Sequence, residues 1–367
     1  MAKVVVGMSG GVDSSVAAYL LKQQGYDVIG LFMRNWEEDD PSGICTADED
    51  FSDVRRVSEI LSIPYYTINF SKDYMDKVFK KFVSDYQKGL TPNPDVLCNR
   101  EIKFSSFADY ARTIGADYIA TGHYCDIDHN GDVHILKTAA DKNKDQTYFL
   151  SMVQGEQLRD VLFPLGKITK PEVRNIAAKL GLSTAEKKDS TGICFIGERN
   201  FRKFLSGYIP MKEGVTIDIT NGRQVGKHRG VFYYTVGQRR GLGIGGLSDG
   251  NGESWYVVDK DVKNNILYVC QGLNDKLFCK SLKTDGFNFI SVRPETNTFD
   301  CYCRIRHRQP LEKARGTLDE NGNLTLVFDK PIKGVARGQY AVIYDYPAAE
   351  ICYGGGEIDK TVSVADE

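Results

Sequence analysis

The strongest constraint on the fold is a glycine-rich stretch, residues 7–15, that lies between a short β-branched run and a helical pattern. The run before it covers residues 4–6, and apolar residues with helical spacing follow over 16–21. A strand, a tight turn and a helix in that order present free backbone N–H groups and the positive end of a helix dipole, which favour an anion. Gly10 and Gly11 allow the backbone to approach a phosphate closely. The stretch therefore predicts a phosphate-binding loop.

Two common phosphate-binding patterns do not match this loop. It has no Gly-Lys-Ser/Thr, and so no lysine for the β/γ-phosphates, and it lacks the Gly-x-Gly-x-x-Gly of dinucleotide-binding folds. Ser9, Ser14 and Ser15 add hydroxyl donors, and Asp13 can cap the helix or hold a metal. The simpler alternative is a glycine turn with a helix cap. The stretch resembles the Ser-Gly-Gly-x-Asp-Ser loop of the ATP pyrophosphatases, which split ATP between the α and β phosphates.

The composition is that of an ordinary globular chain. Its 367 residues predict two or three domains, and 41% of them are hydrophobic and 26% charged. A net charge of −2 leaves nucleic-acid binding open, because a local basic face can bind RNA. No apolar stretch approaches the roughly 20 residues that span a bilayer, and the first strand begins by Val4, which leaves no room for a signal peptide. We therefore expect a cytoplasmic protein without a membrane contact.

Residues 1 to about 122 alternate between predicted strands and helices. After the first strand, strands are expected at 26–33, 65–70 and 117–123, and helices at 50–61, 74–86 and 104–114. Strands separated by helices predict a parallel sheet with right-handed crossovers. Ligands bind at the carboxyl ends of such strands, where residues 7–15, Met33 and Gly122 with His123 fall. We expect one nucleotide pocket at this edge.

The pattern becomes β-like after about residue 203. A hairpin at 125–137 and a helix at 171–182 come before the change, and short alternating runs follow it at 230–236, 255–258, 266–270, 301–308, 324–328 and 340–344. These runs predict two small β-barrels or sandwiches. We expect a catalytic domain at 1–203, a central β domain at 204–280 and a C-terminal β-barrel domain at 281–367. The polar tail after Asp359 is expected to fray.

Two of the nine cysteines stand in polar surroundings. Cys98 follows a loop with two prolines and lies close to Arg100 and Lys103, and positive neighbours lower the pKa of a thiol. Asp95, three residues earlier, can act as an acid or base. Cys194 follows a glycine, with two lysines upstream. Most of the other thiols are expected to be small buried side chains.

A zinc site is not expected. The chain has no Cys-x-x-Cys, and Cys301 with Cys303 lacks a second ligand pair nearby.

Several motifs in this order resemble those of the tRNA-specific 2-thiouridylases. They are residues 7–14, Asn93 to Asp95 with Cys98 and Asn99, Lys144 to Gln146, Gly192 to Gly197, and Thr235 to Leu242. The resemblance covers essentially the whole chain. It implies an N-terminal parallel-sheet ATP pyrophosphatase domain, of the adenine nucleotide alpha hydrolase type, followed by two small β-barrel domains. In that family the O2 atom of the wobble uracil is adenylated, pyrophosphate leaves, and a cysteine persulfide then delivers sulfur to C2 as AMP departs.

The resemblance also implies roles for individual residues. Cys194 would carry the persulfide, Cys98 would be its partner in a transient disulfide, and Asp95 would be a proton shuttle. ATP, with Mg²⁺, would be held by Gly7, Met8, Ser9, Gly10, Gly11, Val12, Asp13, Ser14, Met33 and Gly122. The tRNA, through its anticodon loop, would contact Asn93, Pro94, Asp95, His123, Lys144, Asp145, Gln146, Arg306, His307 and Gln339. A cysteine desulfurase or a sulfur-relay protein would load the persulfide.

A basic run in the second β region agrees with RNA binding. Strand alternation over 302–308 places Tyr302, Arg304, Arg306 and Arg308 on one face. A solvated strand face is the alternative. The family usually has tyrosine where this chain has His307.

Two other functions remain open at this point. One is another adenylating ligase or amidotransferase with the same loop, such as the argininosuccinate-, GMP- or lysidine-forming enzymes, which need no cysteine pair. The other is a nucleotide-regulated RNA-binding module without catalysis, which would release no pyrophosphate.

Overall fold

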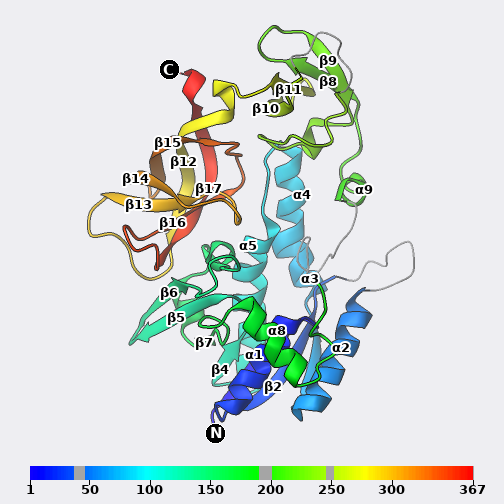
Figure 1. Ribbon diagram of the computed structural model, residues 1–367, viewed down its shortest axis with the longest axis vertical. Coiled ribbons are helices and arrows are strands. Elements are labelled where there is room, and N and C mark those ends of the chain that lie inside the picture. The colour runs from blue at the N-terminus through cyan, green and yellow to red at the C-terminus, as the bar shows by residue number, and fades with distance from the viewer. Residues whose placement is uncertain (37–45, 190–200, 245–251, 367) are drawn as a thin grey trace.

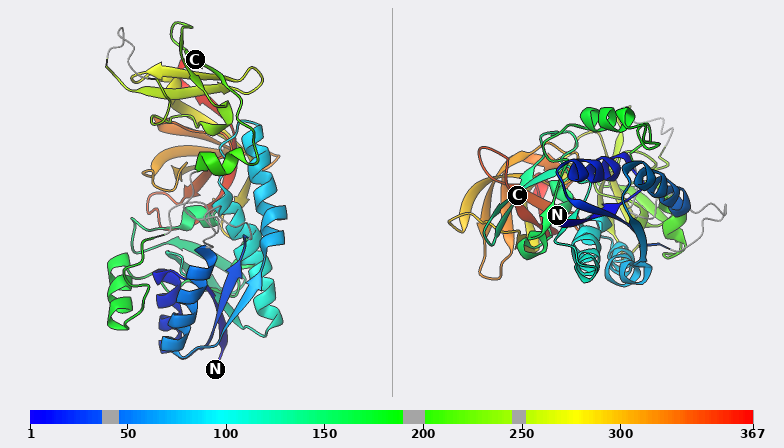
Figure 2. Two further views of the ribbon diagram at one scale, coloured as in Figure 1. Left: turned by 90° about the vertical axis from the view of Figure 1, so that its right-hand side faces the viewer. Right: turned by 90° about the horizontal axis from the view of Figure 1, so that it is seen from below.

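The computed structural model describes residues 1–36, 46–189, 201–244 and 252–366. An α/β domain with the N-terminus lies at one end of an elongated molecule, and a long helical segment rises from it toward a small β domain at the other end (Figure 1). A β-barrel that includes the C-terminal strand packs beside that segment. Figure 2 shows the same three parts from two further sides.

The α/β domain is built on a five-stranded parallel sheet, as the alternating pattern predicts. Its strand order is β3-β2-β1-β4-β7. The strands are β1 (Lys3–Met8), β2 (Asp27–Arg34), β3 (Tyr65–Asn69), β4 (Tyr118–Ala120) and β7 (Val161–Leu162). From β1 the chain first adds β2 and β3 on one side of the sheet and then β4 and β7 on the other. Because these strands are parallel, the carboxyl ends of β2, β1 and β4 lie side by side.

Alternating side chains of β1 pack on opposite layers of helices. Val4 and Val6 belong to the core under α1 (Val12–Gln23), α2 (Thr46–Leu61) and α8 (Lys170–Lys179). Val5 belongs to the core on the other face, with α3 (Ser71–Tyr74), the π-helical η1 (Met75–Phe79), α4 (Lys80–Gln87), α5 (Pro94–Cys98), the π-helical η2 (Asn99–Ser106) and α6 (Phe107–Thr113). Both faces of the sheet are therefore covered, which is why its strands are almost wholly apolar.

The sequence predicts a loop with two prolines before the helix at 104–114. That prediction is wrong from Pro94 onward, where the chain is helical. Asn93 caps a helix there, because its side-chain oxygen accepts from the backbone N–H of Asp95 at 3.2 Å and Pro94 occupies the first turn. Helix then continues through α5, η2 and α6 to Thr113. Cys98 therefore lies at the end of the short α5 and not in a loop.

A hairpin and a short helix connect the α/β domain to the barrel. The predicted hairpin is present as β5 (Cys125–Asn130) and β6 (Val133–Thr138), and α7 (Thr147–Leu150) and the short η3 (Gly155–Leu158) follow. Asn288 of the barrel donates to the carbonyls of Ser151 and Val153, both at 3.0 Å. These bonds fix the barrel against the α/β domain.

The central domain contains a four-stranded sheet within the described residues, in the order β10-β11-β8-β9. Its elements are α9 (Phe201–Ser206), β8 (Gly214–Asp218), β9 (Gln224–His228), η4 (Val231–Tyr233), β10 (Trp255–Asp261) and β11 (Ile266–Gln271). The strand predicted at 230–236 is wrong. Gly230 has φ +130°, and the chain enters a 3₁₀ turn there.

The third domain is a closed six-stranded barrel, in the order β12-β15-β14-β13-β16-β17. The short η5 (Asp275–Leu277) precedes it and η6 (Val364–Asp366) follows it, and its strands are β12 (Phe278–Phe289), β13 (Thr298–Arg304), β14 (Glu312–Leu318), β15 (Leu324–Lys333), β16 (Tyr340–Tyr344) and β17 (Cys352–Ser363). The frayed tail predicted after Asp359 is wrong up to Ser363, because β17 pairs with β12 along this length. No helix in the described ranges is long and apolar enough to cross a membrane.

Candidate active site

The glycine-rich loop between β1 and α1 has the tight conformation that its sequence predicts. Gly10 has φ +73°, and a Cβ there would lie 2.5 Å from the carbonyl oxygen of Asp50, so both conformation and space require glycine. Hydrogen bonds close the loop on itself: the N–H of Ser9 donates to Oγ of Ser14 at 3.1 Å, and that hydroxyl donates to the carbonyl of Gly11 at 3.2 Å. The turn is thus pre-shaped, with the start of α1 directly behind it.

The ends of β2 and β4 meet this loop. A Cβ at Gly122, just past β4, would lie 2.7 Å from the backbone nitrogen of Ser14 and 2.8 Å from the carbonyl carbon of Asp13. Cε of Met33, in β2, lies 3.4 Å from where a Cβ of Gly7 would stand. The predicted convergence at one edge of the sheet is present, and the binding of a nucleotide by these residues stays a prediction.

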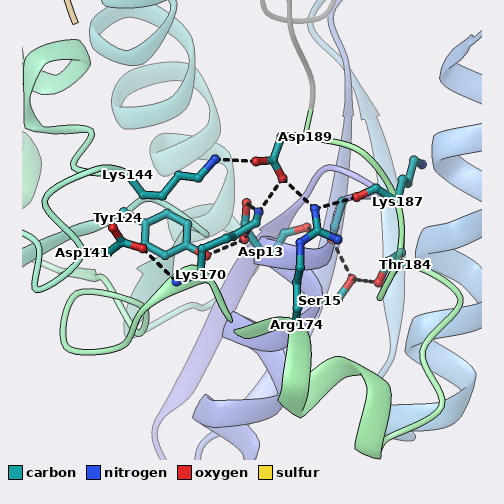
Figure 3. Close-up of polar contacts among 12 residues, drawn as sticks. Asp13, Ser15, Tyr124, Asp141, Lys144, Lys170, Arg174, Thr184, Lys187 and Asp189 are labelled. Carbon is teal, nitrogen blue, oxygen red and sulfur yellow. Dashed lines mark hydrogen bonds and ion pairs between the residues drawn. The ribbon is translucent and has the colours of Figure 1, made fainter. Parts of the chain in front are cut away.

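Asp13 does not cap α1, which was one of the two roles suggested from sequence, and its role as a metal ligand stays a prediction. The cap position of α1 is Gly11, and no side chain caps the helix there. The carboxylate of Asp13 instead accepts from Nζ of Lys170 at 2.8 Å on each oxygen and from the hydroxyl of Tyr124 at 2.8 Å (Figure 3). Burial and the charge of Asp13 raise the pKa of Tyr124, which therefore remains a hydrogen-bond donor at neutral pH.

Three cations surround a second carboxylate beside the loop. The carboxylate of Asp189 lies 2.6 Å from Nζ of Lys144, 2.7 Å from Nζ of Lys170 and 3.2 Å from Nη2 of Arg174 (Figure 3). Burial by itself would raise the pKa of Asp189, but the hydrogen bonds from Lys144 and Lys170 outweigh it and lower the pKa to about 2. The carboxylate of Asp189 is therefore ionised at neutral pH.

The segment just before Asp189 is tied to the back of the glycine-rich loop. Nζ of Lys187 donates to the carbonyl of Gly10 at 3.0 Å and to the carboxylates of Asp50 and Asp53, both at 2.7 Å. Burial lowers the pKa of Lys187, but these two carboxylates raise it by a larger amount. The charged Lys187 thus links the loop, α2 and the chain leading to Asp189.

Sequence reasoning missed Tyr124, Lys170, Arg174 and Asp189. The capping box of Thr169 and Glu172 marks the start of α8 in the sequence. Nothing in the local sequence indicates that Lys170, at that helix start, faces a carboxylate 157 positions away. The packing of α8 against α1 decides this contact.

Cys98 is fully buried in the hydrophobic core on the side of the sheet that α5 and α6 cover. The structure gives a contact for each of its two predicted cationic neighbours: Nε of Arg100 donates to Glu101 at 2.6 Å, and Nζ of Lys103 lies 3.5 Å from Nε2 of His123. The effect of these cations on the Cys98 thiol stays a prediction. A π-helical segment begins directly after Cys98, a feature that often marks functional sites.

His123 joins the Cys98 helix to the strand end near the loop. Its ring lies 5.9 Å from that of Phe104 in a tilted arrangement, and its Nδ1 is 2.7 Å from Oγ1 of Thr121. Burial, followed by the charge of Lys103, lowers the pKa of His123 well below 6.5. The imidazole is therefore neutral at pH 7, next to Gly122.

Several predicted tRNA contacts gather where the barrel meets the α/β domain. The hydroxyl of Tyr148 donates to the carbonyls of Ile305 and Tyr340, both at 3.2 Å. Nε2 of Gln339 donates to the carbonyl of Thr91 at 2.6 Å, two residues before Asn93. The ring of His307 packs on Phe149 at 4.5 Å, and its Nε2 is 2.9 Å from the carbonyl oxygen of Asp145. The structure thus brings Asn93, Asp145, His307 and Gln339 into one region.

The strand predicted over 302–308 is wrong beyond Arg304, where β13 ends. The side chain of Arg304 is 14% exposed, and its guanidinium lies 3.5 Å from the carboxylate of Asp145. Arg306 points inward and donates to the carbonyls of Val236 at 3.0 Å and Gly334 at 2.8 Å. The side chain of Gln146 accepts from the N–H of Tyr124 at 2.8 Å. Arg304, Arg306, Asp145 and Gln146 therefore have intramolecular partners.

The second predicted catalytic cysteine, Cys194, lies outside the described residues, as does Cys45. The seven other cysteines are buried. Within the described part of the chain, no group of three or more His, Cys, Asp and Glu side chains could hold a metal ion.

Three family models match successive parts of the chain. Residues 2–198 match a tRNA methyl transferase HUP domain, 202–271 a tRNA methyl transferase PRC-barrel domain, and 279–358 an aminomethyltransferase beta-barrel domain. The three ranges correspond to the three parts of the fold. A solved 4-thiouridine synthetase–RNA complex with bound ATP is similar at a TM-score of 0.34 and 16% identity, over 57% of this chain and 50% of that one, a likeness too low to support a conclusion.

Curated relatives match over nearly the full length. The tRNA-specific 2-thiouridylase MnmA of Streptococcus sanguinis is 54% identical over 362 residues, which cover 98% of this chain and 95% of the relative. The tRNA-specific 2-thiouridylase MnmA 1 of Geobacillus kaustophilus is 53% identical over 364 residues, 99% of this chain and 96% of the relative. The chain belongs to the family of tRNA-specific 2-thiouridylases.

Proposed function

We propose that this chain is an ATP-dependent tRNA-uridine 2-sulfurtransferase that replaces O2 of the wobble uracil with sulfur. One observation carries the proposal: a phosphate-type loop and a helix bearing Cys98 reach the same edge of one sheet. Gly122 packs on the loop, His123 follows it, and Lys103 of the Cys98 helix lies 3.5 Å from His123. Full-length relatives named 2-thiouridylases support the same activity.

The chemistry needs an activated oxygen and an activated sulfur. ATP supplies the adenylyl group that turns O2 into a leaving group, with release of pyrophosphate. The loop residues 7–14, with Met33 and Gly122, bind this nucleotide through backbone N–H groups and the N-terminus of α1. Mg²⁺ is commonly held by one or two carboxylates together with phosphate oxygens. The carboxylate of Asp13 fits that pattern and would hold the ion there.

The two cysteines carry and release the sulfur. The terminal sulfur of a Cys194 persulfide bonds to C2, and the C2–O2 bond breaks as O2 departs on AMP. The Cys98 thiolate then attacks the Cys194 sulfur, which breaks the S–S bond to the transferred sulfur and leaves a Cys98–Cys194 disulfide. A thiol reductant must restore both thiols. A cysteine desulfurase or a relay protein supplies the persulfide sulfur.

The base and the tRNA are held where the α/β domain meets the barrel. Extrusion of the target base from the anticodon loop is required for access to C2. Asn93, Pro94 and Asp95 meet that base, and Asp95 moves the proton. Contacts to the tRNA come from His123, Lys144, Asp145, Gln146, Arg306, His307 and Gln339. The intramolecular bonds of Asp145 and Arg306 mean that their contact to RNA requires a change of partner.

The domain division and the location are part of the same proposal. Residues 1–203 form the catalytic domain, 204–280 the central β domain and 281–367 the C-terminal barrel domain. The proposed location is the cytoplasm, where tRNA modification takes place.

Methyl transfer is a second candidate, because two of the matching family models are described as tRNA methyl transferase domains. Mass spectrometry of tRNA nucleosides separates the two, since exchange of oxygen for sulfur and addition of a methyl group give different masses. We expect wobble 2-thiouridine to disappear from cells lacking this protein. A missing methylated nucleoside, with 2-thiouridine intact, would contradict the proposal.

Single cysteine variants test the sulfur chemistry. Cys194→Ser should abolish 2-thiouridine formation while tRNA-dependent pyrophosphate exchange survives. Cys279→Ser, in the barrel, is the matched control and should retain both activities. A Cys194→Ser protein that still forms 2-thiouridine would contradict the persulfide role. An RNA-binding module without catalysis would show no pyrophosphate exchange in any variant.

A further inference from the structure

A cluster of three cations lies beside the glycine-rich loop; Lys144 is proposed above as a tRNA contact, and the other two, Lys170 and Arg174, have no function assigned above. Lys144, Lys170 and Arg174 all contact the carboxylate of Asp189 (Figure 3). They come from two separate parts of the chain: Lys144 from the loop before α7, and the other two from the first turns of α8. One carboxylate with three cationic partners is a site shaped for an anion with more charge than a carboxylate carries.

The position of Lys170 relates this cluster to the loop. Its side chain is 8% exposed, and its ammonium is held at 2.8 Å by both carboxylate oxygens of Asp13, which is part of the loop. The loop lacks the lysine that a Walker loop provides for the β/γ-phosphates. Lys170 places an ammonium next to the same loop from a helix far away in the sequence.

The outer part of the cluster is accessible. The side chains of Lys144, Arg174 and Asp189 are 36%, 34% and 34% exposed, whereas Lys170 forms the buried base. The backbone donors at the start of α8 already have partners: the N–H of Lys170 donates to Asp141 at 3.0 Å, and that of Thr169 donates to Glu172 at 2.7 Å. An incoming anion would therefore be bound by the side-chain cations and not by the helix N-terminus.

We propose that Lys144, Lys170 and Arg174 form the binding site for the pyrophosphate part of ATP, and that the carboxylate of Asp189 occupies this site as an internal competitor. The inference rests on the proposed use of ATP by the loop. Pyrophosphate displaces Asp189 from the three cations, because it brings several negative oxygens where Asp189 brings two. Lys170 is the central contact, and Asp13 positions it.

Binding of inorganic pyrophosphate to the full-length protein, measured by titration calorimetry without tRNA or sulfur donor, tests the inference. We expect Lys170→Met and Arg174→Gln each to lower the affinity at least tenfold, the size of effect expected for a lost charged hydrogen bond. Lys179→Met, on the exposed side of the last turn of α8, is the matched control and should bind like the parent protein. Lys170→Arg keeps the charge and should retain more affinity than Lys170→Met. This variant tests the inference if the methionine variant folds poorly.

Asp189→Asn separates competition from a structural role. Removal of an internal competitor should tighten pyrophosphate binding about five- to tenfold, whereas loss of a purely structural ion pair would leave it unchanged or weaken it. Equal binding by the parent and Lys170→Met, or weaker binding by Asp189→Asn, would overturn the inference. Because the assay contains no tRNA, a protein that binds pyrophosphate as expected but makes no 2-thiouridine would contradict the proposed function alone.

Discussion

The ammonium of Lys170 lies 2.8 Å from both carboxylate oxygens of Asp13, although 157 positions separate the two residues. Asp13 belongs to the loop after the first strand, and Lys170 opens a helix near the end of the α/β domain. Their contact fixes α8 against α1 beside the predicted phosphate site. A buried ammonium depends strongly on such a partner, because an unpaired buried charge is costly.

Asp13→Asn should impair ATP use through this contact. The amide presents one oxygen where the carboxylate presents two charged ones, so Lys170 is held less firmly and the proposed Mg²⁺ ligand is lost. We expect the KM for ATP in tRNA-dependent pyrophosphate exchange to rise about tenfold, the effect of a charged hydrogen bond. Asp27→Asn, an exposed position at the opposite end of the sheet, should change nothing. Unchanged ATP kinetics in Asp13→Asn would restrict Asp13 to a role in packing.

Gly122→Ala should displace the loop. Its new methyl would meet the backbone of Ser14 at 2.7 Å and of Asp13 at 2.8 Å, and backbone atoms cannot yield as a flexible side chain can. We expect a loss of about 1–3 kcal/mol of stability and a larger loss of nucleotide affinity. Gly226→Ala, where the nearest atom is 3.5 Å away and the φ angle is ordinary, is the control. Thermal melts with and without ATP measure both effects, and equal ATP protection of the two variants would argue against a nucleotide site at Gly122.

Arg306→Leu tests whether this arginine stabilises the contact between two domains or binds tRNA. The guanidinium bonds to Val236 of the central domain and Gly334 of the barrel, and its loss leaves both carbonyls without this donor. We expect a loss of about 1–3 kcal/mol in the free energy of unfolding, measured by urea denaturation. Arg308→Leu, an exposed neighbour, should cost far less. A variant of Arg306 with parental stability but weakened tRNA binding would instead assign this arginine to the RNA.

The stability of the protein should fall as the pH drops below about 6.5, the ordinary pKa of histidine. Burial lowers the pKa values of His123, His134, His228 and His307 in the folded protein. Below 6.5 the unfolded chain therefore binds more protons than the folded one, and the free energy of unfolding rises with pH through this range, by at most about 1.4 kcal/mol per pH unit for each histidine. Urea denaturation at pH 7 and at about 5.5 measures the slope, which His123→Gln should reduce. A slope that is the same in both proteins would show that His123 does not contribute.

The sequence alone determined the parallel sheet, the glycine-rich loop and the family. The apolar strands at 4–6 and 26–33 and the helical runs between them are local patterns, and the hairpin at 125–137 has its turn at Gly131, with φ +60°. Local periodicity failed at 94–104, where a cap and a proline start a helix, and at 230–236, where the chain turns. It also failed at Arg306, because alternation predicts a face only as long as the strand continues, and β13 ends two residues earlier.

The partners of the charged side chains were decided only by the tertiary structure. The family resemblance implies tRNA contacts for Lys144 and Arg306; in the structure the first contacts Asp189, and the second bonds to a carbonyl of the central domain and to one of its own barrel. Lys170 and Arg174 had no sequence signal at all. A side chain's partner depends on how distant segments pack, and the long flexible stems of lysine and arginine reach whichever carboxylate or carbonyl that packing brings near. The sequence therefore determined which chemistry the loop and the cysteines suggest, and the fold determined which cations stand beside the glycine-rich loop.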